Sequence, residues 1–199
     1  MLESTPAFPA TFTFDPPEKV ANWRPLVAWL LAIPHLIVLY VLQAVSGVVG
    51  LISWFVILFT GALPEGLANV QVMYLRYALR TYTYVAFMHE DYPPFTFATT
   101  AADPGDDPRV RVDVRPQLTD RNRITVAFRI ILVIPSLLVL AVLGIGAYVG
   151  MVIAFFAVLF TGTWPQGIRD FVIKVMRWWL RTQVYYLLLT DVYPPFSLD

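Results

Sequence analysis

The sequence predicts a mainly α-helical integral membrane protein made of two tandem copies of one unit. Its composition, two long uncharged stretches and an internal repeat support this fold class. Of the 199 residues, 58% are hydrophobic and only 14% are charged, against about 25% charged in an ordinary soluble domain. A chain this poor in charge is typical of membrane proteins.

The uncharged stretches indicate membrane-spanning helices. Asp, Glu, Lys and Arg are absent from residues 25–64 and from residues 130–168. Each stretch is about twice the ~20 residues that cross a ~30 Å hydrocarbon core. Small residues interrupt them at 43–47 and 143–147. Each stretch is therefore expected to form a two-helix transmembrane hairpin, with first helices at 23–42 and 124–143 and second helices ending near Thr60 and Thr161.

An internal repeat relates the two stretches. A shift of 101 residues aligns 22–97 with 123–198 without a gap, and 26 of these 76 positions are identical. The matches include "LFTG", coincident prolines, glycines and arginines, and a closing "YPPF" in each copy. This pattern indicates a tandem duplication. We expect a first copy with an N-terminal strand at 1–97, an acidic, turn-rich linker at 98–108 and a second copy at 109–199.

A third helix of different character is expected in each copy, at about 67–88 and 168–189. Both are apolar but carry a polar stripe at i, i+3 and i+4 spacing. We expect them to lie in the membrane interface, with their arginines at headgroup level. The alternative is a span whose arginines face the protein interior, since a charge at the bilayer centre costs several kcal/mol.

Charge also predicts the topology. All 14 Lys and Arg residues fall outside the expected hairpin tips, at the amino terminus, in the centre or near the carboxyl terminus. The positive-inside rule assigns these regions to the cytoplasm of a bacterial plasma membrane. We therefore expect a multi-pass protein with four spans, both termini inside, and two parallel halves related by a pseudo-two-fold axis along the membrane normal. The first eight residues lack the features of a signal peptide.

Short cytoplasmic strands should accompany the helices. Residues 11–14 and 110–114 alternate with period two, as half-buried strands do. Residues 95–99 and 196–199 resemble them. These four segments are expected to pair into a small sheet under the helices.

Two sets of polar residues are candidate sites. His35 is the titratable group deepest in the first stretch, and such a group is functional by default. However, it follows Pro34 and is replaced by Ser136 in the second copy, which favours satisfaction of a freed helix carbonyl. The second set comprises lipid-headgroup candidates four residues apart in each copy: Arg76, Arg80, Arg177 and Arg181. Alternatively, these arginines snorkel or pair with Glu90 and Asp191 at the helix ends.

The doubled "YPPF" is interpreted as a structural corner. Two prolines end a helix and force an extended path, and the flanking aromatic side chains can anchor the turn. The corners are Tyr92, Pro93, Pro94 and Phe95 in the first copy and Tyr193, Pro194, Pro195 and Phe196 in the second.

Residue types and motifs argue against catalysis. The chain has no cysteine and only two histidines, so no disulfide, thiolate or His-based metal site is expected. No GxSxG, P-loop, GxGxxG or HExxH pattern occurs, and the uncharged stretches offer no carboxylate for ion-coupled transport. We expect no cofactor and no enzyme activity. A net charge of zero gives no reason to expect nucleic acid.

The repeated blocks resemble a known family. "LLAIPHLIVLYVL", "LFTGALPEG", "RWWLRTQVYYLLLTDVYPPFSL" and "VRVDV" are similar to a bacterial membrane family known only as a domain of unknown function, number four-three-eight-nine. The resemblance covers both copies and implies a multi-pass plasma-membrane protein, without activity or site residues to transfer. The first copy departs from it at residues 88–97, "MHEDYPPFTF".

Two functions are consistent with these features. The first is a non-enzymatic accessory or scaffold subunit that binds membrane lipids and other subunits, or a second copy of itself, in the membrane and at its cytoplasmic face. The second is a lipid- or small-hydrophobe-binding or transport protein that uses the arginine pairs. An enzyme acting on lipid ranks third.

Overall fold

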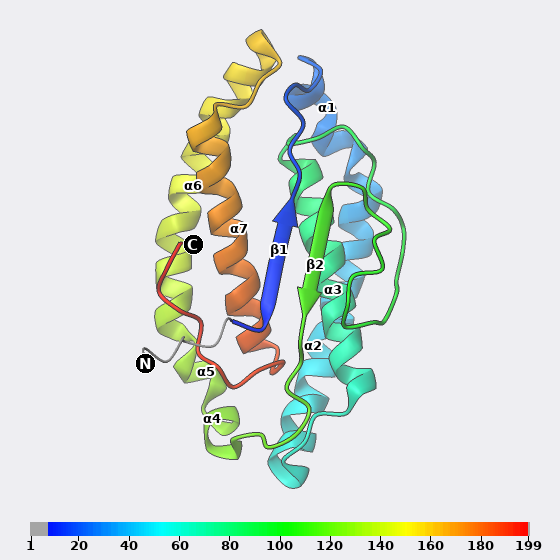
Figure 1. The fold of residues 1–199 in the computed structure, drawn as a ribbon, viewed down its shortest axis with the longest axis vertical. Helices are drawn as coiled ribbons and strands as arrows, with labels where there is room; N and C mark the ends of the chain where they lie inside the picture. Colours follow the sequence, from blue (N-terminus) through cyan, green and yellow to red (C-terminus); the bar gives the residue numbers. More distant parts are fainter. Residues whose placement is uncertain (1–7, 199) are drawn as a thin grey trace, which may run out of the picture.

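Helices dominate the part of the chain that the computed structural model describes, residues 8–198. Each copy contributes one strand, a short helical entry, one long apolar helix and one amphipathic helix (Figure 1). In chain order the elements are β1 (Ala10–Phe14), α1 (Arg24–Leu31), α2 (Ile33–Thr60), α3 (Glu65–Val85), β2 (Val110–Val114), α4 (Arg123–Ala127), α5 (Arg129–Leu132), α6 (Ile134–Thr161) and α7 (Gln166–Tyr186).

The long helices α2 and α6 correct the predicted two-helix hairpins. Each is one continuous helix of 28 residues, about 42 Å long at 1.5 Å per residue. The small residues expected to form a turn instead allow neighbouring helices to approach closely. In α2, Ser46 hydrogen-bonds to the side chain of Gln71 in α3, and the backbone carbonyl of Ser46 accepts from Gln71 Nε2 at 2.8 Å. The hairpins that form are α2 with α3 and α6 with α7.

Glycine ends both long helices, within a "TGxxPxG" sequence that both copies share. Gly61 and Gly162 adopt left-handed conformations with φ of 73° and 69°, which glycine adopts without steric strain. Pro64 and Pro165 then precede α3 and α7. The chain therefore reverses within a few residues in each copy.

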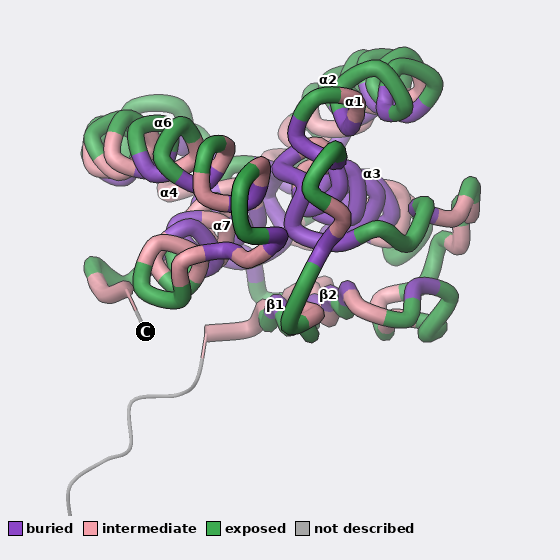
Figure 2. Tube along the Cα trace, turned by 90° about the horizontal axis from the view of Figure 1, so that it is seen from above, coloured by how far each residue is buried: buried purple, intermediate pink, exposed green. Residues whose placement is uncertain are grey.

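The molecule has three layers (Figure 2). Helices α2 and α6 form an outer layer with largely exposed surfaces, α3 and α7 form the middle layer, and β1 and β2 form a two-stranded ribbon on the far side. Phe12, Val110 and Val112 of the ribbon are buried against the middle layer. The hydrophobic core therefore lies between the ribbon and the outer helices.

The ribbon confirms two of the four predicted strands. β1 and β2 pair antiparallel, with Phe12 opposite Val112 at the centre. Within the described chain, residues 95–99 and 196–198 belong to no sheet. Arg76 and Arg181 instead donate to the carbonyls of Ala98 and Ser197. Position 199 lies outside the described residues.

The two copies run in opposite directions. In Figure 1, α2 and α6 point opposite ways along the long axis, as do β1 and β2. The pseudo-two-fold axis is therefore perpendicular to the long helices and passes through the ribbon centre. This corrects the expectation that the two copies run parallel. That expectation required two spanning helices in each uncharged stretch, whereas each stretch contains one long helix.

Candidate functional site

Many large hydrophobic side chains are exposed on one face of the molecule, formed by α1, α2, α5 and α6. We call it the apolar face. Large hydrophobic side chains are exposed along its whole length, far more than isolated surface residues would explain. The most exposed include Ile37, Tyr40, Leu51, Phe59, Ile130, Leu138, Val142, Tyr148 and Phe160. Neither α2 nor α6 contains Asp, Glu, Lys or Arg.

Two helical stretches on this face are long and apolar enough to cross a membrane. They are Ile33–Thr60 and Arg129–Thr161, and in an apolar 18-residue segment of each only 22% and 17% of the residues are buried within the fold. A core helix of a soluble protein would be mostly buried, whereas these helices leave their apolar surface uncovered. Length and composition alone make this weak evidence for a membrane protein.

The opposite side of the molecule carries charge. Arg111 is exposed on β2, Arg115 is exposed just after its end, and Asp170 and Lys174 are exposed on α7. The ribbon, on whose side these charges lie, and the outer helices that carry the apolar face are therefore on opposite sides of the molecule (Figure 2).

Arg76 and Arg80 point away from the apolar face into a buried cluster. Arg76 Nε lies 3.3 Å from Asp103 Oδ2, and Arg80 donates to Asp103 Oδ1 at 3.0 Å. Arg76 also donates to the carbonyls of Ala98 and Thr100 at 3.1 and 3.0 Å. The arginines are 3% and 2% exposed, so a headgroup at the surface does not reach them. Their partner is Asp103, not the predicted Glu90.

The second arginine pair also faces the ribbon side. Arg177 Nε donates to the carbonyl of Phe12 in β1 at 3.2 Å, and Arg181 donates to the carbonyl of Ser197 at 3.1 Å. Both are half-buried. Binding of a lipid by these residues stays a prediction, and the structure places them on the side away from the apolar face.

His35 joins its helix to the first corner and to α3. Its Nδ1 lies 2.7 Å from the hydroxyl of Tyr77, and its ring stacks on Phe95 with centroids 4.1 Å apart. Tyr92 also packs on the ring, at 4.7 Å. At the equivalent place, Ser136 hydrogen-bonds to Thr182 at 2.8 Å. The contact made by His35 is therefore tertiary, where the sequence suggested a local helix carbonyl.

Both "YPPF" corners lie a few residues after the end of the amphipathic helix and pack against the helix layer. α3 ends at Val85 and α7 at Tyr186. Tyr193 packs on Tyr185 with centroids 5.2 Å apart, and Phe196 packs on Trp178 at 5.8 Å. The corners thus fix the start of the extended segments that follow.

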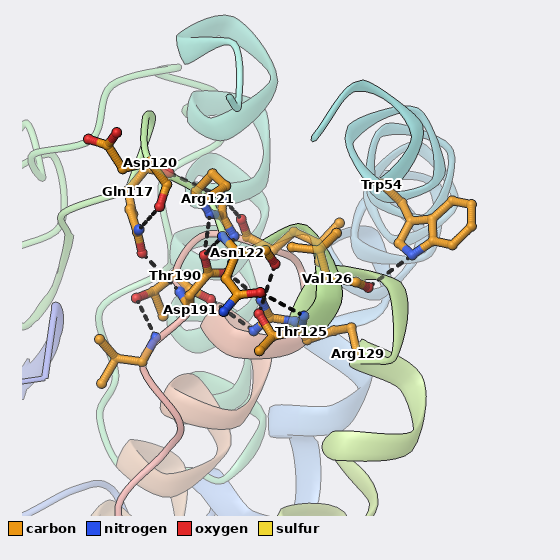
Figure 3. A network of polar contacts seen from close by, with 12 residues as sticks. Trp54, Gln117, Asp120, Arg121, Asn122, Thr125, Val126, Arg129, Thr190 and Asp191 are labelled. Carbon is orange, nitrogen blue, oxygen red and sulfur yellow. Dashed lines mark hydrogen bonds and ion pairs between the residues drawn. The ribbon is translucent and has the colours of Figure 1, made fainter. Parts of the chain in front are cut away.

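A polar cluster that the sequence did not predict forms around Asp191 (Figure 3). Arg121 binds the carboxylate through Nε and Nη2 at 3.1 and 2.8 Å, and the backbone N–H of Asn122 also donates to it. Arg129 donates to Asp191 and lies 3.8 Å over the ring of Tyr185. Burial acts to raise the pKa of Asp191, but these donors and positive charges lower it overall.

The first copy builds a matching cluster with different residues. The backbone N–H of Ala21 donates to Glu90, which corresponds to Asp191. Arg24 lies 4.3 Å over the ring of Tyr84, the counterpart of Tyr185. Next to it, burial lowers the pKa of His89 to about 4, and its Nε2 lies 3.2 Å from Thr83 Oγ1. Each cluster ties the amphipathic helix to the segment that enters its own copy.

Two apolar clefts lie between the copies. Each is formed by the long helix of one copy and the carboxyl end of the amphipathic helix of the other. The first, of about 380 Å³, is lined by Ser46, Gly47, Gly50, Leu51, Trp54, Arg129, Ile130, Tyr186, Leu187 and Leu188. The second, of about 350 Å³, is lined by Tyr82, Val85, Ala86, Leu140, Gly144, Met151, Val175, Met176 and Trp179.

Comparison with known families explains the duplication. The family model described as "Domain of unknown function (DUF4389)" matches residues 23–96 and again residues 123–197. The chain belongs to the DUF4389 family. Two tandem DUF4389 units therefore make up most of it, as the sequence resemblance suggested. No curated protein and no solved structure matches the chain.

Membership in the DUF4389 family does not assign a chemical activity to the chain. Among the described residues, no group of three His, Asp or Glu side chains is placed to hold a metal ion. His89, Glu90 and Asp91 are adjacent in sequence but diverge, since Asp91 pairs with Arg109 while Glu90 binds Ala21 N–H. Asp103 and Asp191 were missed as cluster centres because their arginine partners lie at least 23 residues away in sequence.

Proposed function

We propose that this DUF4389 protein lies in one leaflet of a membrane, with the apolar face inserted and the ribbon exposed to the cytoplasm. One observation carries the proposal: the outer helices and the ribbon are opposite layers of the molecule (Figure 2), and exposed apolar side chains lie on the first while exposed charges lie on the side of the second. A bilayer interface matches such layers when the long helices lie in its plane.

The position of the charges favours this orientation over a vertical one. Arg76 and Arg177 lie at the middle of α3 and α7, and Arg111 is exposed near the ribbon centre. If α2 and α6 crossed the bilayer, these groups would lie near its midplane. An exposed arginine there costs at least ~2.5 kcal/mol.

In this orientation the protein acts as a membrane scaffold or accessory subunit. The apolar face binds lipid, and the ribbon side presents charged groups and a strand edge to partner proteins. The pseudo-two-fold axis then lies along the membrane normal, and both termini lie on the cytoplasmic side.

Single cysteines at equivalent positions test the orientation, since the chain has no native cysteine. Glu65→Cys and Gln166→Cys lie at the exposed starts of α3 and α7, at opposite ends of the molecule. In the proposed orientation both cysteines lie on the cytoplasmic side. In intact bacterial cells they should therefore not react with a membrane-impermeant maleimide, and both should react after permeabilisation. If one of the two reacts in intact cells, the long helices span the membrane and the in-plane orientation is wrong.

A lipid-handling function is the second candidate, favoured by the clefts between the copies. The first cleft combines apolar walls with Ser46 and Arg129, which suits an amphiphile with a polar head. We expect Gly47→Leu to reduce the lipid that co-purifies with the protein, because a Cβ at Gly47 meets nothing within 4 Å and the longer side chain would fill the cleft. Gly144→Leu, equally unobstructed in the second cleft, is the matched control. Unchanged lipid content in Gly47→Leu argues against this function.

A further inference from the structure

The first cleft between the copies connects the apolar face to a buried positive charge. Leu51 and Ile130 line this cleft and are 60% and 70% exposed on the apolar face, whereas Ser46 and Arg129 line it and are only 2% and 1% exposed. A molecule that enters from the apolar face therefore passes apolar walls before it comes near Arg129. The lining of the second cleft contains no charged residue, so the two clefts differ in charge.

The charge around Arg129 is not balanced by the fold. Arg121 and Arg129 both pair with Asp191, and within residues 8–198 no other carboxylate forms an ion pair with either arginine. One carboxylate therefore meets two guanidinium groups, and this cluster keeps one positive charge (Figure 3). Because a buried charge without a counter-charge is costly, an anion that reaches the cluster would be stabilised.

Arg129 also has a hydrogen-bond donor that the fold does not use. Its Nη1 donates to the carbonyl of Thr190 at 2.9 Å, and its Nη2 donates to Asp191. Its Nε is buried and has no acceptor among the described residues. A buried donor without an acceptor is unfavourable, and a single free N–H suits one oxygen atom of a small anionic group.

We propose that the first cleft binds a long-chain fatty acid. The acyl chain lies between α2 and the carboxyl end of α7, and the carboxylate accepts from Arg129 Nε and supplies the missing negative charge. A single-chain acid fits better than a phospholipid for two reasons. The cleft volume of about 380 Å³ is near the lower end of the range of ligand pockets, ~300–1,000 Å³, and one free donor suits a carboxylate better than a bulky phosphodiester.

This inference rests on the lipid-handling function and deepens it, because it names the chemical class that the first cleft prefers. It is independent of how the molecule lies in the membrane. The result of the cysteine-labelling test therefore neither supports nor contradicts it.

Photocrosslinking with two matched probes tests the preference for an acid. The probes are palmitic acid and hexadecanol, each with a diazirine group in the chain, and the full protein is reconstituted in phosphatidylcholine vesicles. Alkaline pH keeps the carboxyl group ionised. We expect adducts on α2 and on the carboxyl end of α7, with the acid labelling this cleft at least about tenfold more than the alcohol, because only the acid gains a charge-assisted hydrogen bond.

Matched variants of the protein locate the charge. Arg129→Gln should lower labelling by the acid about tenfold, to the level of the alcohol, and leave labelling by the alcohol unchanged. Arg123→Gln removes an exposed arginine of α4 that does not line the cleft and should change neither. Thermal unfolding verifies that both variants fold. If Arg129→Gln does not fold, the comparison of the two probes on the wild-type chain still decides.

Three outcomes would overturn the proposal. Equal labelling of the cleft by the two wild-type probes would exclude recognition of the carboxylate but leave the lipid-handling function standing. Labelling by neither probe would count against both. Competition by unlabelled phosphatidylglycerol as effective as that by unlabelled palmitate would identify an anionic phospholipid as the occupant in place of a fatty acid.

Discussion

At the residue scale, Asp103 explains how two arginines lie in the interior of the fold. Its side chain is fully buried, and it accepts from Arg76, Arg80 and the backbone of β2. A buried charge is tolerated only when it is paired and hydrogen-bonded. The linker at 98–108 is therefore a structural part of the first copy, although its acidic, turn-rich composition is typical of a solvated segment.

Asp103→Asn tests this role. It leaves two buried guanidinium groups without a counter-charge, so we expect the free energy of unfolding to fall by about 3–5 kcal/mol. Denaturant unfolding in micelles, followed by tryptophan fluorescence, measures the loss. Asp106→Asn, an exposed position in the same linker, should change stability by less than ~0.5 kcal/mol. Equal effects of the two variants would contradict the buried cluster.

His89 makes stability depend on pH. Burial lowers its pKa to about 4 in the folded protein, while the unfolded chain keeps a value near 6.5. Between these values the unfolded state binds more protons, so stability decreases as pH falls from about 6.5 to about 4, by roughly 3 kcal/mol in total.

Replacement by the residue of the other copy isolates this effect. Thr190 is the counterpart of His89, so His89→Thr should remove most of the loss between pH 6.5 and 4 in the same unfolding measurement. Further loss below about pH 3.8 should persist, because Asp191 has a lowered pKa in the folded state. An unchanged slope between pH 6.5 and 4 would exclude His89 as the cause.

At the element scale, the continuity of α2 decides the architecture. Val48 lies in the middle of the helix and is 60% exposed. Val48→Pro removes a helix hydrogen bond and clashes with the preceding turn, which costs about 3 kcal/mol or more. Circular dichroism and thermal unfolding should show a large destabilisation, whereas Val48→Ala should be nearly neutral. Tolerance of proline would indicate a turn at this place, as in the predicted hairpin.

The sequence predicts much of this architecture, but its errors have physical causes. Alternating residues identified β1 and β2, and the helix ends predicted near Thr60 and Thr161 are the observed ends of α2 and α6. The small residues around Ser46 were misread as a turn, because the same residues also permit close helix packing, here against Gln71. Pattern alone does not distinguish these uses.

The candidate site was less predictable, because its contacts are distant in sequence. The spacing of Arg76 and Arg80 correctly indicated a shared helix face, but that face meets Asp103 and the ribbon side instead of a lipid surface. Nothing local marks Asp103 as their partner among the acidic residues of its linker. A polar stripe in such a sequence indicates which face of a helix carries the charged side chains. Only the fold identifies the residues that contact this face.

At the scale of the whole molecule, the apolar face should determine membrane affinity. Phe59 and Phe160 are equivalent residues, 78% and 77% exposed on α2 and α6. Burying a phenylalanine contributes about 1.5–3 kcal/mol, so Phe59→Glu with Phe160→Glu should lower the partition coefficient at least about tenfold.

Vesicle flotation of the detergent-solubilised protein, after detergent removal, measures this partition. Thr13→Glu, on the exposed face of the ribbon, adds negative charge on the other side of the molecule and should leave partition unchanged. If the double variant floats as well as the wild-type chain, the apolar face is not the surface that meets lipid.

The centred pairing of β1 with β2 has a consequence for the origin of the chain. A strand pair with a two-fold axis at its middle, here at Phe12 and Val112, is the arrangement that two identical subunits make in an isologous dimer. An ancestor with one copy would have had a single strand and would have needed a second molecule to complete the ribbon. Tandem duplication of such an ancestor would turn that subunit contact into an internal one. Only then could the halves diverge, with His35 in one and Ser136 in the other, so that a symmetric dimer became a protein with two different sides.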